Sequence, residues 1–171
     1  DFAGPFGTKK NDFKHILVIV DTLSRFVWLQ ATKSTAAPEV IKTIRDRVIP
    51  LVGAPSVAIV DQQSSYMSKQ FQDFCRTAGI LLKPIPQGAS DGNGISERCI
   101  RSVTNHVKRL VADRGWKKIP EVLPLVEFIM RNARREDIRL SPSEIALGFR
   151  PRGPWSSDLP DVPSGLTPLQ L

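Results

Sequence analysis

The chain has 171 residues, of which 41% are hydrophobic, so it is long enough for one domain with a buried core and too short for two domains of ordinary size. Its longest apolar runs are broken within a few residues by Asp21 and Lys83, which excludes a membrane span. The two cysteines and two histidines are scattered along the sequence, which argues against a disulfide framework or a zinc site, and the formal net charge is +7.

The first half of the chain is predicted to contain a β-hairpin followed by a helix. Residues 15–20 and 25–30 are rich in β-branched and aromatic side chains and are joined by a short polar link, as in a hairpin. Residues 34–53 have apolar side chains at helical spacing, with Ser and Thr at possible cap positions and a glycine at the end. The pattern therefore favours one helix over this stretch.

Short strands and helices then alternate. Residues 56–60 are predicted to form an apolar strand of the parallel kind that is covered on both faces, residues 68–79 a helix, and residues 80–85 another strand. The glycine-rich stretch 86–94 is expected to be a mobile loop. A long helix is predicted over residues 95–114, another over 117–135, and a short one over 141–148.

This order of elements predicts an α/β fold with a mixed sheet and helices on both faces. Residues 1–149 would form the folded domain, and the proline-rich residues 150–171 a C-terminal extension or linker. The right-handed crossover rule places the strand that ends at Asp61 parallel to the first strand and beside it. Asp1 and Asp61 would then lie close together.

Glu97 completes a set of three carboxylates with Asp1 and Asp61. It stands near the start of the long helix, and 35 residues separate it from Asp61. Carboxylate oxygens are the ligands that Mg²⁺ prefers. A third acid close to Asp1 and Asp61 would therefore favour a metal-binding role for the strand-end aspartate over a role in the turn. An acid at a strand end is more commonly only a turn former, so the three residues alone leave both interpretations open.

Five ordered motifs follow one another along the chain: "DFAGPF", "ILVIVDTLSRFVWL", "VDQQSSYMSKQF", "GNGISERCIRSV" and "RNARREDIRLSPSEIALGFRPRGP". Together they resemble the catalytic core of integrases from retroviruses and LTR retrotransposons, and the Gypsy-like branch most of all. The resemblance implies a ribonuclease-H-like fold with a five-stranded mixed sheet. It also implies that Asp1, Asp61 and Glu97 are the catalytic residues and hold two Mg²⁺ or Mn²⁺ ions.

The implied function is that of a metal-dependent polynucleotidyl transferase, an enzyme that trims the 3′ ends of element DNA and joins them to target DNA. DNA would be the partner, the protein would act as a homo-oligomer, and chromosomal DNA as substrate implies a nuclear location. The basic background supports DNA binding, because six of the seven net positive charges lie in residues 93–155. A basic face that only keeps the protein in solution would explain the charge equally well.

Several residues on and near the long helix are candidates for DNA contacts. Arg101 and Lys108 fall on the same strip as Glu97 and are placed to hold phosphates, Arg98 lies further round the helix, and Asn93 matches a loop position that contacts DNA in the family. Asp21 is better explained as a turn residue. Asn132 matches a family asparagine, for which a structural hydrogen bond is expected.

The match departs from the family pattern at Gln63, where a glycine is usual. A side chain there would add strain if the backbone needs a positive φ. The alternative function is therefore a decayed or domesticated core that keeps the fold and the basic surface as a DNA-binding or dimerisation module without catalysis.

Overall fold

The computed structural model describes residues 1–6, 13–86, 90–111 and 119–153, without the side chains of residues 90–93. The predicted extension 150–171 lies almost wholly outside these residues, so its separation from the domain stays a prediction.

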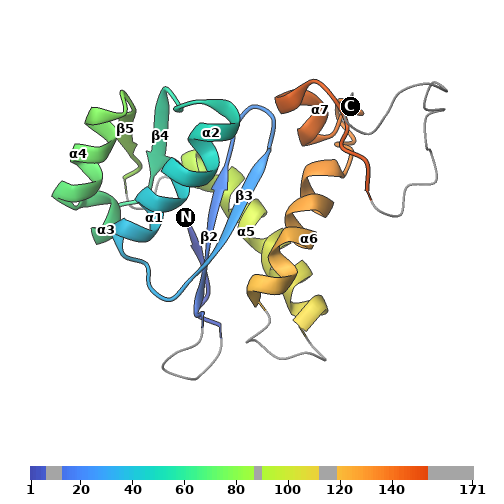
Figure 1. Ribbon diagram of the computed structural model, residues 1–171, viewed down its shortest axis with the longest axis horizontal. Helices are drawn as coiled ribbons and strands as arrows, with labels where there is room; N and C mark the ends of the chain where they lie inside the picture. Colours follow the sequence, from blue (N-terminus) through green and yellow to red (C-terminus); the bar gives the residue numbers. More distant parts are fainter. Residues whose placement is uncertain (7–12, 87–89, 112–118, 154–171) are drawn as a thin grey trace, which may run out of the picture.

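A three-stranded antiparallel sheet forms the centre of the molecule (Figure 1). Its strands are β1 (Phe2–Ala3), β2 (His15–Val20) and β3 (Val27–Thr32), in the order β1-β2-β3. Val20 pairs with Val27 beside the turn, and His15 pairs with Thr32 at the far end. The hairpin is confirmed, although its second strand begins two residues later than expected, because Arg25 has a φ of 66° and belongs to the turn.

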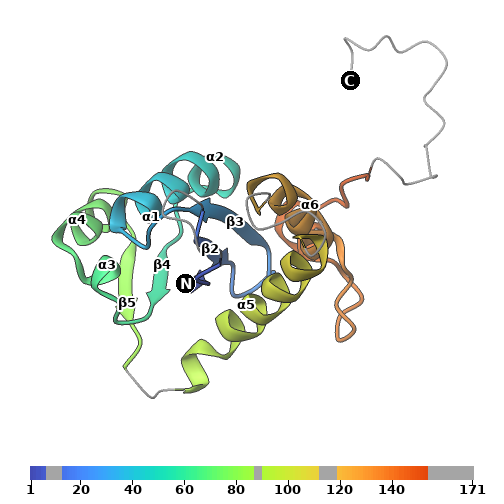
Figure 2. The same cartoon turned by 90° about the horizontal axis from the view of Figure 1, so that it is seen from below.

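Helices cover both faces of this sheet, as expected (Figure 2). One face packs on α5 (Ser90–Val111) and α6 (Ile119–Asn132), and the other on α1 (Ala37–Thr43) and α4 (Lys69–Thr77). The alternation along each strand divides the core, because Ile16 and Val18 face α5 and α6 whereas Leu17 faces the other layer. This alternation fixes the register of the hairpin.

The long helix predicted over residues 34–53 is continuous but not uniform. It consists of α1, a π-helical segment η1 (Ile44–Val48) and α2 (Ile49–Val52), and Gly53 follows with a φ of 82°. The expected Ser and Thr caps were wrong, since Ala36 is the N-cap and no side chain caps the helix.

The five-stranded sheet was also wrong, because two further strands form a separate sheet. β4 (Val57–Val60) pairs in parallel with β5 (Leu81–Pro84), whereas among the described residues β1 pairs with β2 and not with β4. A cavity of about 530 Å³ lies between β2 and β4. Consequently, Val57 and Ile59 are about half exposed, and β4 is not covered on both faces.

The remaining helices surround this framework. α3 (Ser64–Met67) follows β4, and α7 (Pro142–Leu147) follows α6. The Ser141 cap forms a capping box with Glu144, and Gly148 ends α7 at a φ of 80°, as predicted.

The long helix predicted over residues 95–114 is α5. It begins earlier than expected, because residues 90–94 already belong to it. Among the described helices, none has the length and apolar character needed to cross a membrane.

Candidate functional site

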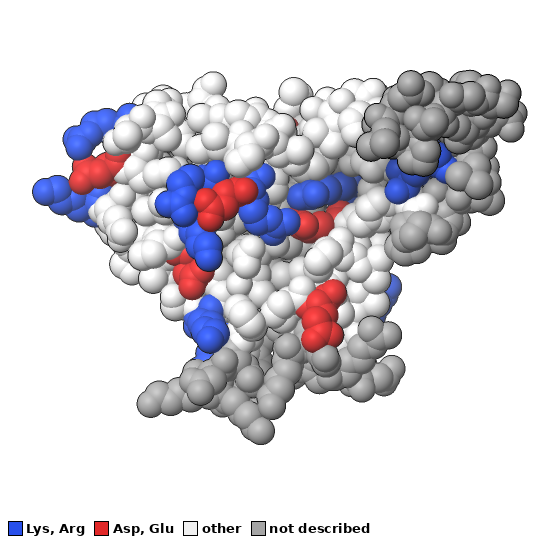
Figure 3. Space-filling view, viewed as in Figure 1, with Lys and Arg blue, Asp and Glu red and all other residues white. Residues whose placement is uncertain are grey.

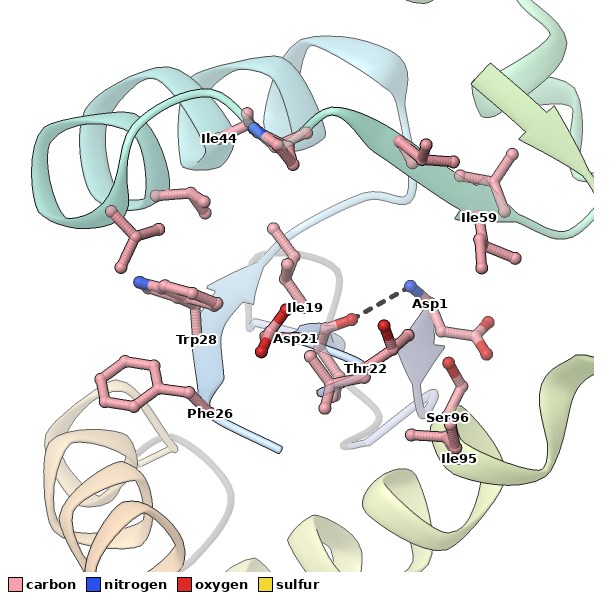
Figure 4. A pocket seen from close by; sticks show the side chains of 18 of the residues that line it. Asp1, Ile19, Asp21, Thr22, Phe26, Trp28, Ile44, Ile59, Ile95 and Ser96 are labelled. Atoms are coloured by element: carbon pink, nitrogen blue, oxygen red, sulfur yellow. Dashed lines mark hydrogen bonds between the residues drawn. The ribbon is translucent and has the colours of Figure 1, made fainter. Parts of the chain in front are cut away.

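Asp1 lies at the end of the cavity between the two sheets. Its α-amino group donates a hydrogen bond of 3.1 Å to the carbonyl oxygen of Val18 (Figure 4). Burial lowers the pKa of this amine to about 6, although the nearby carboxylate of Asp61 acts in the opposite direction. The Asp1 carboxylate is directed toward the start of α5, where Ile95 and Ser96 line the same cavity.

Asp61 directly follows β4 and shapes the turn into α3. Its Oδ1 accepts a hydrogen bond of 3.2 Å from the backbone N–H of Gln63, which is a typical aspartate turn contact. Gln63 has a φ of −63°, so the expected strain from the missing glycine is absent. The turn role of Asp61 leaves its second oxygen available for another partner.

Aromatic packing connects the segments of Asp1 and Asp61. The ring of Phe2 stacks on the ring of Tyr66, with centroids 6.2 Å apart. Tyr66 is buried, and burial together with the Asp61 carboxylate raises the pKa of its hydroxyl. The two segments therefore approach each other through side chains, although β1 and β4 share no hydrogen bonds.

Glu97 lies one residue beyond Ser96 on α5, and its side chain is exposed. Among the residues that the structure describes, no three His, Cys, Asp or Glu side chains are close enough to hold one metal ion. The donor set of three carboxylates is chemically suited to Mg²⁺, but the three groups are not gathered into one site. The catalytic and metal-binding roles of Asp1, Asp61 and Glu97 thus stay predictions.

The proposed DNA contacts lie on the exposed side of α5. Arg101 and Lys108 are exposed, as is Glu97, so the strip expected from helical spacing faces solvent. Arg98 is also exposed but lines a second hollow. Asn93 belongs to the first turns of α5, and its side chain is outside the described part of the chain.

Two polar residues have the structural roles expected for them. The Asp21 Oδ2 accepts hydrogen bonds from the backbone N–H and the hydroxyl of Ser24, at 2.8 and 2.6 Å. Asn132 donates a hydrogen bond of 2.9 Å to the carbonyl oxygen of Phe128, one helical turn earlier. Both residues are therefore explained by local structure.

Sequence reasoning missed a buried charge network at the outer edge of β3. Glu127 is 5% exposed and forms ion pairs with Arg47 and Arg131, at 2.7 and 3.1 Å. Its Oε1 also accepts a hydrogen bond of 2.6 Å from the backbone N–H of Leu29, while the two arginines donate to carbonyl oxygens of β3. The sequence contains one signal of this network, which is the acid Glu127 within an otherwise apolar part of α6. A charged residue in such a run is expected to be buried, and a buried charge needs a partner.

The charges on the face seen in Figure 3 are mixed. Basic and acidic side chains alternate there, without a broad field of one sign. The described structure also contains exposed ion pairs, among them Arg45–Asp46 and Arg76–Asp73.

Solved structures share the fold. The chain superposes on a chain of the simian T-cell lymphotropic virus intasome, solved in complex with a PP2A regulatory subunit, with a TM-score of 0.77 and 19% identity, covering 93% of this chain and 57% of that one. It also superposes on the HTLV-2 integrase catalytic core domain in complex with magnesium, with a TM-score of 0.71 and 20% identity. This match covers 85% of the present chain and 92% of the HTLV-2 chain. At these identities the likeness establishes an α/β fold of the integrase-core, ribonuclease-H-like type.

Viral polyproteins are similar in sequence. The Pro-Pol polyprotein of Simian foamy virus type 3 is 25% identical over 92% of this chain, and the Pol polyprotein of Feline endogenous virus ECE1 is 30% identical over 81%. The chain spans only 13% of the length of each polyprotein. The integrase core domain matches residues 1–90. Because this match covers more than half of the sequence, the chain belongs to the integrase core domain family.

Proposed function

We propose that this chain is the catalytic core of a retroelement integrase of the Gypsy-like branch, which processes 3′ DNA ends and joins them to target DNA. The observation that carries the proposal is the meeting of three segments at one cavity, two of which lie within the residues that match the integrase core domain. Asp1 lies in the cavity, Phe2 packs on Tyr66 of the Asp61 segment, and Ser96 precedes Glu97 at the cavity wall.

The three carboxylates are the groups that would hold Mg²⁺ or Mn²⁺. Bound in a pair about 4 Å apart, such ions activate an attacking oxygen and stabilise the leaving one in phosphoryl transfer. Three acids near one another would repel, and bound cations would offset this repulsion. The Asp1 and Asp61 segments are in contact through Phe2 and Tyr66, and the Glu97 side chain is exposed.

DNA would lie along the exposed strip of α5. Arg101 and Lys108 would contact phosphates there, and Asn93 and Arg98 would contribute at the start of the helix. Solved relatives include dimeric and trimeric forms of the HTLV-2 core, which supports a homo-oligomer for this chain as well. A chromosomal substrate places the proposed activity in the nucleus.

The test is disintegration, the reverse of the joining reaction, on a branched DNA oligonucleotide with Mn²⁺. Asp61→Asn and Glu97→Gln should each abolish strand cleavage and rejoining while the protein stays folded. Asp73→Asn, which removes an exposed acid on α4, is the matched control and should retain activity.

A second function is favoured by the separated carboxylates. If a folded wild-type chain binds branched DNA but neither cleaves nor rejoins it with Mn²⁺, the protein is a DNA-binding or dimerisation module that has lost catalysis. In that case Glu97→Gln should leave DNA affinity unchanged with and without divalent ions.

A further inference from the structure

A second hollow, of about 320 Å³, is surrounded by arginines. It lies between the turn that joins β2 to β3, the start of α5 and the segment between α6 and α7. Val20, Val27, Cys99 and Met130 supply its apolar walls. The basic groups that line it come from three separate parts of the chain and are Arg25, Arg98, Arg134 and Arg135.

Arg25 is held in an unusual conformation at this hollow. Its φ of 66° lies in the left-handed region, which costs energy for a side chain of this size. Its Nη1 atom is buried and has no hydrogen-bond partner among the described residues. A strained backbone and an unpaired buried donor at one residue both disfavour the folded state, so something else must favour keeping Arg25 there.

The charge around Arg25 is not balanced within the hollow. Burial lowers the pKa of Arg25, and Arg135 and Arg98 lower it further, whereas Asp137 and Asp21 act in the opposite direction with smaller effects. These two acids are already engaged, since Asp137 binds Arg135 and Asp21 binds Ser24. The guanidinium groups therefore repel one another.

The hollow is also pre-organised and adjoins the proposed catalytic cavity. Arg135 is fixed by a hydrogen bond of 3.2 Å to the carbonyl oxygen of Leu23 and by two bonds to Asp137, at 3.1 and 2.5 Å. Val20 and Ile95 line both this hollow and the cavity that contains Asp1. A ligand in the hollow would lie directly beside the start of α5.

We propose that this arginine-lined hollow binds a phosphate group of the DNA backbone next to the reacting strand. The inference rests on the proposed function and adds a phosphate subsite to it, formed by Arg25 and Arg98 and completed by Arg134 and Arg135. Guanidinium groups bind phosphate oxygens in a bidentate manner, so one phosphodiester in the hollow would pair with Arg25 and Arg98 and offset the repulsion between the arginines.

The experiment measures binding of a fluorescently labelled DNA duplex by anisotropy, in EDTA and over a series of salt concentrations. The variants are Arg25→Asn, Arg98→Gln and the double variant. Arg76→Gln on α4 removes one exposed charge far from the hollow and is the matched control. Each subsite variant should weaken binding and reduce the slope of log affinity against log salt by about 1, more than the control does.

Arg25→Asn also gives a readout that a purely structural role would not produce. Asparagine tolerates a positive φ better than arginine and carries no charge, so this variant should melt at a higher temperature while binding DNA more weakly. Loss of stability together with unchanged DNA affinity would overturn the inference.

The remaining outcomes separate this inference from the function on which it rests. If the wild-type chain binds DNA and the subsite variants behave like Arg76→Gln, the phosphate subsite is wrong and the proposed integrase function stands. If the folded wild-type chain binds no DNA at low salt, both are wrong.

Discussion

The ring of Phe2 stacks on the ring of Tyr66, with 6.2 Å between their centroids and 22° between their planes. This contact joins the first strand to the helix that follows Asp61, although the two strands concerned belong to different sheets. Tyr66 also packs edge-on against Phe71 of α4. The relative position of Asp1 and Asp61 therefore depends on an aromatic cluster and not on a shared ladder of hydrogen bonds.

Tyr66→Phe should leave the free energy of unfolding unchanged or raise it slightly. The Tyr66 hydroxyl is buried and has no hydrogen-bond partner among the described residues, so its removal relieves a desolvation cost. Tyr66→Leu should instead lower the free energy of unfolding by roughly 2–4 kcal/mol, because it removes a fully buried ring and its aromatic contacts. Urea denaturation of both variants tests the pair, and a loss above about 1 kcal/mol in Tyr66→Phe would reveal a partner for the hydroxyl.

Glu127→Gln should destabilise the protein strongly, by about 3–5 kcal/mol. Glu127 is the only acid that the structure pairs with Arg47 and Arg131 within the described residues, and its loss leaves two partly buried guanidinium groups without a counter-charge. Burial already lowers the pKa of Arg131, which shows that its charge is poorly solvated. The measurement is again urea denaturation at neutral pH.

Asp46→Asn is the control for Glu127→Gln. It breaks the Arg45–Asp46 pair, whose side chains are exposed to water. Water replaces such a pair easily, so the variant should be nearly as stable as the wild type. Equal losses in the two variants would contradict the claim that burial makes the Glu127 network important.

Local patterns predicted local structure well. The hairpin followed from two runs of β-branched and aromatic residues, and α7 followed from Ser141, Pro142 and Gly148, because turn and cap chemistry is decided by neighbours in sequence. Relationships between distant residues were harder to foresee. The division into two sheets is a matter of which strands become neighbours, and no periodicity within a strand encodes its neighbours.

The carboxylate site and the arginine hollow were likewise hard to predict where they depend on residues that are distant in sequence. The resemblance indicated Asp1, Asp61 and Glu97, but their relative positions depend on the packing of segments that are distant in sequence. The arginine hollow draws on three separate parts of the chain, and Arg25 was expected in a strand. Its left-handed backbone had no local signal, since neither glycine nor asparagine occupies the position.

Gln63→Gly should lower the free energy of unfolding by roughly 0.5–1 kcal/mol. Gln63 has the extended conformation that any residue adopts, with φ −63° and ψ 146°, so a glycine gains nothing in the folded state and adds freedom to the unfolded one. Gly79→Ala is the contrasting variant, because Gly79 has a φ of 70° and nothing within 4 Å of an added Cβ. It should cost roughly 1–2 kcal/mol from backbone strain alone. Stabilisation by Gln63→Gly would mean that this turn needs a glycine after all.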